Sequence, residues 1–140
     1  MKRGLVLGKF MPLHAGHVGL IEFAAMHCDE LIVLVCATAQ EMIAGELRIK
    51  WVTKTFSEND KIKPQLLHYD DTILPSTSES SREVSKIWAA HLRTILPKID
   101  LIFSSEKYGD YVAEYLPCTH IPYDPSRLKT PVSATQINQN

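Results

Sequence analysis

The sequence predicts an α/β fold, in which a Rossmann-like parallel sheet carries helices on both faces. Short apolar runs alternate along the chain with segments whose apolar residues recur at helical spacing. The run 31–37 (LIVLVCA) is continuous and β-branched, which suits a central parallel strand covered on both faces. Strands that alternate with helices are typically joined by right-handed crossovers into a parallel sheet, so this alternation predicts a parallel sheet.

The first half of the chain predicts two strands, each followed by a helix. The short apolar run within 3–7 suits a buried strand. In 18–27 the apolar residues have helical spacing, and we expect this helix to begin near Ala15. After the strand at 31–37, the segment 46–56 shows the helical spacing again.

The second half repeats the alternation with shorter strands. The polar, hydroxyl-rich stretch 70–81 (DDTILPSTSESS) separates the two halves, and we expect it to be a mobile loop. A long helical pattern follows and is ended by Pro97, which cannot continue a helix. We expect one strand at 64–69, just before this loop. After the loop we expect strands at 100–103 and 119–123 and helices at 82–96 and 108–116.

The composition suits one soluble domain, which we place at residues 1–140. Apolar residues make up 45% of the chain, enough for a core, and the formal net charge of −1 argues against a general nucleic-acid binder. No apolar run approaches the ~20 residues of a membrane span, and the amino-terminal run is too short for a secretory signal. We therefore expect a cytoplasmic protein without a nucleic-acid or membrane partner.

The three cysteines, Cys28, Cys36 and Cys118, form no CxxC pair. Such scattered cysteines predict buried free thiols rather than a disulfide framework or a zinc site.

The stretch GKFMPLHAGH, residues 8–17, begins at the carboxyl end of the first predicted strand, where open α/β sheets bind ligands. Gly8 permits a sharp turn off the strand, and Gly16 permits close approach of a ligand. The helix start directs free N–H groups and the positive end of its dipole to the same place. His14 and His17, three residues apart, share one face of the first helical turn. Together these features predict a polyphosphate site.

Other interpretations of this stretch are open from the residues alone. Two histidines three apart often occur by chance as loop residues without a task. A metal site is less favoured because no third ligand stands nearby at metal-site spacing. The P-loop pattern GxxxxGK[ST] and the dinucleotide pattern GxGxxG are both absent from the sequence.

GKFMPLHAGH resembles the GxFxPxHxGH signature of the nucleotidylyltransferase (HIGH) superfamily, and every fixed position of the signature is matched. A second stretch, TPVSATQIN at 130–138, resembles the carboxyl-terminal ISxTxIR of the same superfamily. Ser133 and Gln136 have capping-box spacing, so we expect a helix to begin at Ser133. Its amides, with the Ser133 and Thr135 hydroxyls, would form a second phosphate cradle, and the alternative is a plain helix cap.

The second motif departs from the family at Asn138, where the family has an arginine. Asparagine can donate a hydrogen bond to a phosphate but cannot neutralise it, so Arg127 or Lys129 is a candidate for the missing charge. The sequence ends at Asn140, and we expect either a piece of a longer protein or an unusually short family member.

Within the superfamily, three further stretches resemble the nicotinamide-nucleotide adenylyltransferases of archaea and the amino-terminal domain of bifunctional kinase/adenylyltransferase proteins. They are AGELRIKW at 44–51, SKIWAAHLRTILPKIDLIFSSE at 85–106 and YDPSR at 123–127. The resemblance implies that Arg48 contacts a substrate phosphate and that Trp88 stacks on the nicotinamide ring, as a cationic pyridinium favours an indole face. The pattern alone favours a core position for Trp88.

The resemblance implies a reaction of nicotinamide mononucleotide with ATP that gives NAD and pyrophosphate. Lys9, His14 and His17 are the implied catalytic residues, with Mg²⁺ carried by ATP, and relatives of this kind often form homo-oligomers. The alternatives are another adenylyl- or cytidylyltransferase of the superfamily and a non-catalytic nucleotide-sensing domain. The implied ATP contacts are Gly8, Phe10, Met11, Gly16, Arg127, Ser133 and Thr135.

Overall fold

The computed structural model describes residues 1–70, 72, 74, 82–105 and 108–123. The segment expected to be a mobile loop falls almost entirely outside the described residues. The second motif, together with Arg127, Ser133, Thr135 and Asn138, lies wholly outside them. Within the described part of the chain, no helix has the length and apolar character needed to cross a membrane.

Strands and helices alternate as the sequence predicts, and the five strands of the described chain form one parallel sheet in the order β3-β2-β1-β4-β5. The Rossmann-like α/β fold is therefore confirmed. The elements are β1 (Arg3–Gly8), α1 (Ala15–Ala25), β2 (Glu30–Ala37), α2 (Gly45–Thr55), β3 (Ile62–His68), α3 (Arg82–Ile95), β4 (Leu101–Ser104), α4 (Tyr108–Tyr115) and β5 (Thr119–Pro122).

Among the expected elements, the strand β3 differs most in its first residue: it begins at Ile62 and not at Pro64. A proline lacks the N–H that a strand in the middle of a sheet must donate on one of its sides. β3 lies at the edge of the sheet and pairs only with β2, where Pro64 stands opposite Val33. An edge strand therefore tolerates Pro64 inside it.

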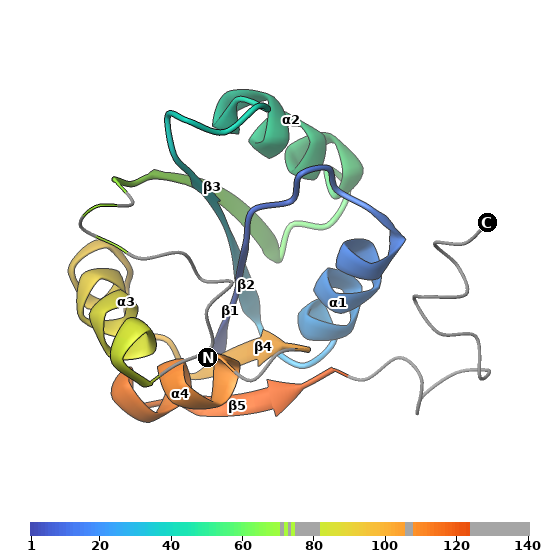
Figure 1. The fold of residues 1–140 in the computed structure, drawn as a ribbon. Helices are drawn as coiled ribbons and strands as arrows, with labels where there is room; N and C mark the ends of the chain where they lie inside the picture. Colours follow the sequence, from blue (N-terminus) through green and yellow to red (C-terminus); the bar gives the residue numbers. More distant parts are fainter. Residues whose placement is uncertain (71, 73, 75–81, 106–107, 124–140) are drawn as a thin grey trace.

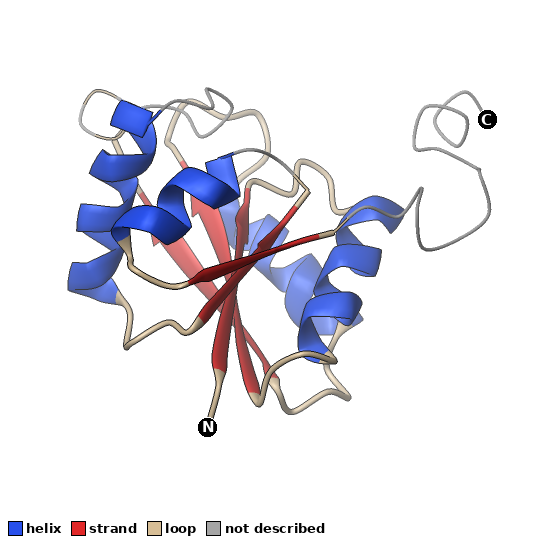
Figure 2. Ribbon diagram, turned by 90° about the horizontal axis from the view of Figure 1, so that it is seen from below, coloured by secondary structure: helices blue, strands red, loops and turns tan. Residues whose placement is uncertain are grey.

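Helices cover both faces of the sheet, with α1 and α2 on one side and α3 and α4 on the other (Figures 1 and 2). Alternate residues of β1 separate the two cores: Leu5 and Leu7 join the cluster under α3 and α4, and Val6 joins the cluster under α1 and α2. β2 is buried on both faces, which explains its continuous apolar sequence. Each fully buried aliphatic side chain contributes roughly 1.5–3 kcal/mol to folding.

The three cysteines are free, as the sequence predicts. Cys28 and Cys36 are buried, and Cys118 is partly buried.

The strand order places a topological switch beside β1. From β1 the chain proceeds to β2 and β3 on one side, and it then returns through α3 to β4 on the other side of β1. In open α/β sheets, ligands bind at the carboxyl ends of strands whose connections leave in opposite directions, as those of β1 and β4 do. GKFMPLHAGH begins at Gly8, the last residue of β1, and so lies at this switch point.

Candidate active site

The loop after β1 turns at Phe10. Phe10 has a φ of 53°, in the left-handed region, and no described glycine has a positive φ. The prediction that Gly8 makes the turn is therefore wrong: Gly8 completes β1, and a Cβ there would lie 3.3 Å from the Phe10 ring. The Phe10 side chain is buried, and this burial offsets a backbone cost of order 1–3 kcal/mol.

The two histidines of the motif cap the start of α1. His14 is the N-cap residue, and its Nδ1 accepts a hydrogen bond from the Gly16 backbone N–H at 3.1 Å. The Nδ1 of His17 accepts from the His14 backbone N–H at 3.2 Å. The two rings stack with centroids 3.7 Å apart, and the Phe10 and His17 rings are nearly perpendicular with centroids 4.9 Å apart. The expectation that both imidazoles share one side of the first turn is confirmed.

These hydrogen bonds fix the tautomer of both neutral imidazoles. A backbone N–H can only donate, so each Nδ1 acts as the acceptor and the proton of each ring lies on Nε2. Each ring therefore carries an Nε2–H group that is able to donate to an anion. The backbone hydrogen bonds that hold the two rings therefore also determine that Nε2 is the nitrogen able to donate to a ligand.

The pKa of His17 is lowered from 6.5 to about 4, chiefly because burial disfavours the charged ring and secondarily because of the neighbouring His14. His17 is therefore neutral at pH 7. It acts on a ligand as a hydrogen-bond donor, and the net positive charge near it must come from another residue.

Lys9 supplies such a charge at the end of β1. Its Nζ lies 2.6 Å from Oε2 of Glu41 and 6.0 Å from the centroid of the Tyr69 ring. Partial burial is the largest single influence and disfavours the charged amine, but the interactions with Glu41 and Tyr69 together outweigh it, and the pKa of Lys9 is raised. Burial also opposes ionisation of Glu41, yet hydrogen bonds from Lys9, Thr38 and Arg48 hold its pKa below the ordinary value. The pair is ionised at neutral pH.

Arg48 lies beneath this pair with a fully buried side chain. Its guanidinium donates to the carbonyl oxygens of Lys9 at 2.9 Å and Cys36 at 3.2 Å, and to Oε1 of Glu41 at 2.6 Å. These contacts tie the first turn of α2 to the ends of β1 and β2. Direct contact with a substrate phosphate, the role implied by the resemblance, stays a prediction and requires the guanidinium to become accessible.

Trp88 lies in the core between α3 and the sheet. The residue is 1% exposed. Its ring and that of Tyr69 pack in a T-shaped arrangement, with centroids 5.0 Å apart. This burial matches the position that the helical pattern favours. Stacking on a nicotinamide ring stays a prediction, and it requires one face of the indole to become accessible to the ligand.

Three residues beyond the motif were not predicted and lie at carboxyl ends of strands or just after them. Glu41 follows β2, Tyr69 follows β3, and Ser104 ends β4. Tyr69 and Ser104 carry a positional signal, because a polar group just after a buried strand lies at the ligand edge of the sheet. Glu41 lies in the loop before α2, and no local pattern connects it with Lys9.

Ser104 belongs to a hydrogen-bonded chain with a histidine and an aspartate. Its Oγ lies 2.9 Å from Nε2 of His120, whose Nδ1 lies 2.6 Å from Oδ1 of Asp110. The order of groups is that of a hydrolase triad, but Ser104 is buried and a Cβ on Gly109 would lie 2.2 Å from its Oγ. Because nothing can approach that oxygen, the chain serves to link α4 with β4 and β5.

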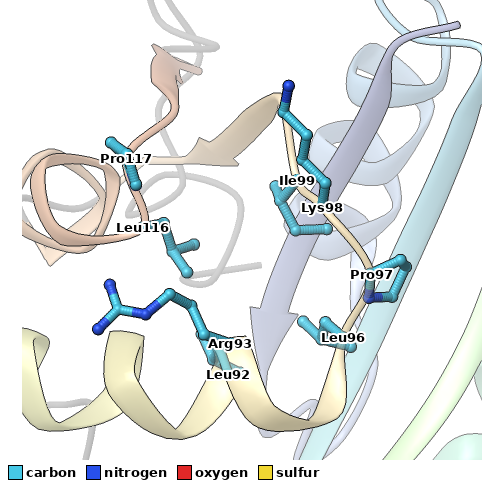
Figure 3. Close-up of a pocket in the computed structure, with 8 residues that line it drawn as sticks. All are labelled: Leu92, Arg93, Leu96, Pro97, Lys98, Ile99, Leu116 and Pro117. Carbon is cyan, nitrogen blue, oxygen red and sulfur yellow. The ribbon is translucent and has the colours of Figure 1, made fainter.

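A cavity of about 340 Å³ lies away from the motif, among the carboxyl ends of α3 and α4 and the segment before β4 (Figure 3). Apolar side chains line most of it, and Arg93 and Lys98 stand at its sides. It contains none of the residues that the sequence singles out for binding. Its lining residues are Leu92, Arg93, Leu96, Pro97, Lys98, Ile99, Leu116 and Pro117.

A scan against protein-family models gives no match. Among curated proteins, the chain is 31% identical over 111 residues to the nicotinamide-nucleotide adenylyltransferase of Halobacterium salinarum, a match that covers 75% of this chain and 56% of that protein. It is 25% identical over 155 residues to the trifunctional NAD biosynthesis/regulator protein NadR of Escherichia coli, covering 98% of this chain and 36% of that protein. The matched region is thus about half of the archaeal protein's length and a smaller share of NadR.

Solved structures share the fold. A NadR protein in complex with NAD and AMP-PNP superposes with a TM-score of 0.63 at 21% identity, covering 99% of this chain and 42% of that chain. A bifunctional NMN adenylyltransferase/ADP ribose pyrophosphatase from Francisella tularensis, complexed with AMP and a manganese ion, gives a TM-score of 0.58 at 17% identity, covering 88% and 37%. The curated relatives confirm the resemblance that the sequence motifs indicate, and the solved structures confirm the fold.

Proposed function

We propose that this chain, a relative of the nicotinamide-nucleotide adenylyltransferases, transfers the adenylyl group of ATP to nicotinamide mononucleotide and so forms NAD and pyrophosphate. The observation that carries the proposal is the histidine pair at the start of α1. Two imidazoles with their protons on Nε2 stand at the carboxyl end of β1, and Lys9 lies in the same loop. This set of donors suits a triphosphate.

The reaction needs little covalent chemistry from the protein. An oxygen of the mononucleotide phosphate attacks the α-phosphorus of ATP, the bond to the bridging oxygen breaks, and pyrophosphate leaves with the electron pair. A phosphate is already a nucleophile, so neither a general base nor a covalent intermediate is required. Catalysis then consists of aligning the two phosphates and stabilising the charge on the leaving group.

The motif residues divide this work. His14 and His17 donate Nε2–H groups to the triphosphate, and Lys9 adds the positive charge that a neutral His17 lacks. Gly8, Phe10, Met11 and Gly16 are proposed to form the rest of the ATP site, beside the positive end of the α1 dipole. Beyond the described residues, Arg127, Ser133 and Thr135 are proposed to hold the β- and γ-phosphates.

Mg²⁺ is proposed to enter with ATP, and when bound it shares the negative charge of the triphosphate. In the described part of the chain, no group of three or more histidine, cysteine, aspartate or glutamate side chains is placed to hold a metal ion. The residues proposed above therefore act on phosphate oxygens, and none is assigned as a metal ligand.

The mononucleotide is proposed to bind beside the triphosphate, with Arg48 and Trp88 as its implied contacts. Both side chains are buried in the present state, so binding of the mononucleotide requires them to become accessible. The proposed setting is the cytoplasm.

Two measurements test the proposal. Thermal shifts with ATP, CTP, NAD and the nicotinamide and nicotinate mononucleotides show which nucleotides bind, and pyrophosphate release shows which pairs react. We expect release and NAD formation only with ATP plus a pyridine mononucleotide. Release with CTP would indicate a cytidylyltransferase, and binding without release from any pair would indicate a nucleotide sensor.

A further inference from the structure

Glu41 joins two cations that come from different elements. Its Oε2 accepts from Lys9, in the loop after β1, at 2.6 Å, and its Oε1 accepts from Arg48, in α2, at 2.6 Å. The backbone N–H of Thr38 donates to the same Oε1 at 3.0 Å. The carboxylate is 8% exposed, so these three donors replace nearly all of its water.

The partners of Glu41 differ in what a ligand can reach. The Arg48 side chain is fully buried, whereas the Lys9 side chain is 30% exposed. An ammonium group has three N–H donors, so Lys9 retains donors for an anion while one is bound to Glu41. Of these two cations, Lys9 is the one that presents charge at the end of β1.

Burial also indicates that Glu41 remains in place when a ligand binds. Removing the carboxylate from Arg48 would leave a buried guanidinium without a counter-charge, which is strongly unfavourable. Arg48 in turn donates to the carbonyl oxygen of Lys9. Lys9 is therefore held at both ends, its backbone by Arg48 and its ammonium by Glu41.

We infer that Glu41 is a positioning residue for the proposed adenylyl transfer, because its carboxylate holds the Lys9 ammonium at the end of β1, ready to contact the phosphates of the nucleotide. The inference rests on the proposed function. A lysine side chain is long and flexible, and an unrestrained ammonium must be ordered each time a phosphate binds. Glu41 does this ordering in advance.

A double-mutant cycle tests the inference, with Glu41→Gln, Lys9→Met and the double variant. Glu41→Gln keeps the shape of the side chain and removes its charge, and we expect kcat/KM to fall about tenfold or more, the scale of one charge-assisted hydrogen bond. In the Lys9→Met background the same change should have a much smaller effect, limited to what the loss of the Arg48 partner causes by itself. An equal loss in both backgrounds would overturn the inference, because Glu41 would then act independently of Lys9.

The control is Glu46→Gln in the first turn of α2. Glu46 is exposed and pairs with the exposed His68 across 3.0 Å. It lies close in sequence to Glu41 and takes no part in the cluster, so kcat/KM should stay unchanged. If Glu46→Gln reduced kcat/KM as much as Glu41→Gln, a general loss of negative charge would explain both, and the inference would fail.

A second measurement follows Lys9 itself and does not depend on turnover. In NMR spectra with the Lys9 side chain assigned, Glu41→Gln should lower the pKa of the ammonium, since Glu41, one of the two partners that raise it, is lost while Tyr69 and the burial remain. Should Glu41→Gln fold poorly, Glu41→Gln/Arg48→Met removes the buried charge together with its partner, and the pKa of Lys9 should again lie below that of Arg48→Met alone. An unchanged pKa of Lys9 in the stable variant would overturn the inference.

Inorganic pyrophosphate separates the failure of the inference from that of the proposed function. By calorimetry, Glu41→Gln should weaken pyrophosphate binding in the wild-type background and leave it unchanged in Lys9→Met. If this coupling is found but no nucleotide pair releases pyrophosphate, the proposed function fails while Glu41 still positions Lys9 for phosphate binding. If nucleotides react but the cycle shows no coupling, the proposed function stands and the inference fails.

Discussion

His17 has two separable tasks, and substitutions that preserve one of them should show this. Its Nδ1 caps α1 by accepting from the His14 backbone N–H at 3.2 Å, and its Nε2–H is the proposed donor to the triphosphate. His17→Ala removes both. Losing a helix cap costs about 1 kcal/mol, and losing one transition-state donor costs about 10²- to 10³-fold in rate.

Asparagine separates the two tasks. The asparagine Oδ1 is bonded to Cγ, as Nδ1 is in histidine, so His17→Asn should restore the cap. It places no donor where Nε2–H stands, so turnover should stay as low as in His17→Ala.

The assays are urea unfolding for the cap and pyrophosphate release under saturating substrates for the donor. We expect His17→Asn to unfold within about 0.5 kcal/mol of the wild type and to turn over at least ~10²-fold more slowly. Full turnover by His17→Asn, or a loss below about tenfold in purified His17→Ala, would remove the Nε2–H of His17 from the mechanism.

The other predictions concern pH, Trp88 and Asn138. Because the folded pKa of His17 is about 4 against 6.5 for a free histidine, the unfolded chain binds more protons between these values. The stability that His17 contributes should therefore be complete above pH 6.5 and decline towards pH 4. Urea unfolding should show this fall in the free energy of unfolding with decreasing pH in the wild type, and the same fall in His17→Asn would contradict the prediction. Trp88→Phe should keep the fold and raise the KM for the mononucleotide more than that for ATP, whereas an equal rise would assign Trp88 to the core alone. Asn138→Arg should raise kcat several-fold under saturating ATP by adding a charge-assisted contact to the leaving pyrophosphate. If Asn138→Arg leaves kcat unchanged while Arg127→Ala lowers it strongly, Arg127 already provides the charge.

The sequence predicts the fold well because its dominant signal is local. The run 31–37 is apolar at every position, as burial on both faces requires, and β2 is the strand between β1 and β3. The position of the motif GKFMPLHAGH is also predicted correctly, since it follows from the end of a strand that can be recognised. What spacing does not reveal is the turn at Phe10, where burial of the ring supports a backbone conformation usually left to glycine.

The charged part of the site depends on contacts that are distant in the sequence. Lys9 and Glu41 lie 32 residues apart and meet because β1 and β2 end side by side in the sheet. A motif compares residue types at fixed spacing, so it assigns Lys9 and Arg48 as cations but cannot show that one carboxylate binds both. The same pattern cannot show that Arg48 is buried while Lys9 is reachable. Two cations that look equivalent in the sequence thus differ in the fold: the Lys9 side chain is partly exposed at the end of β1, and the buried Arg48 donates to the backbone carbonyl of Lys9.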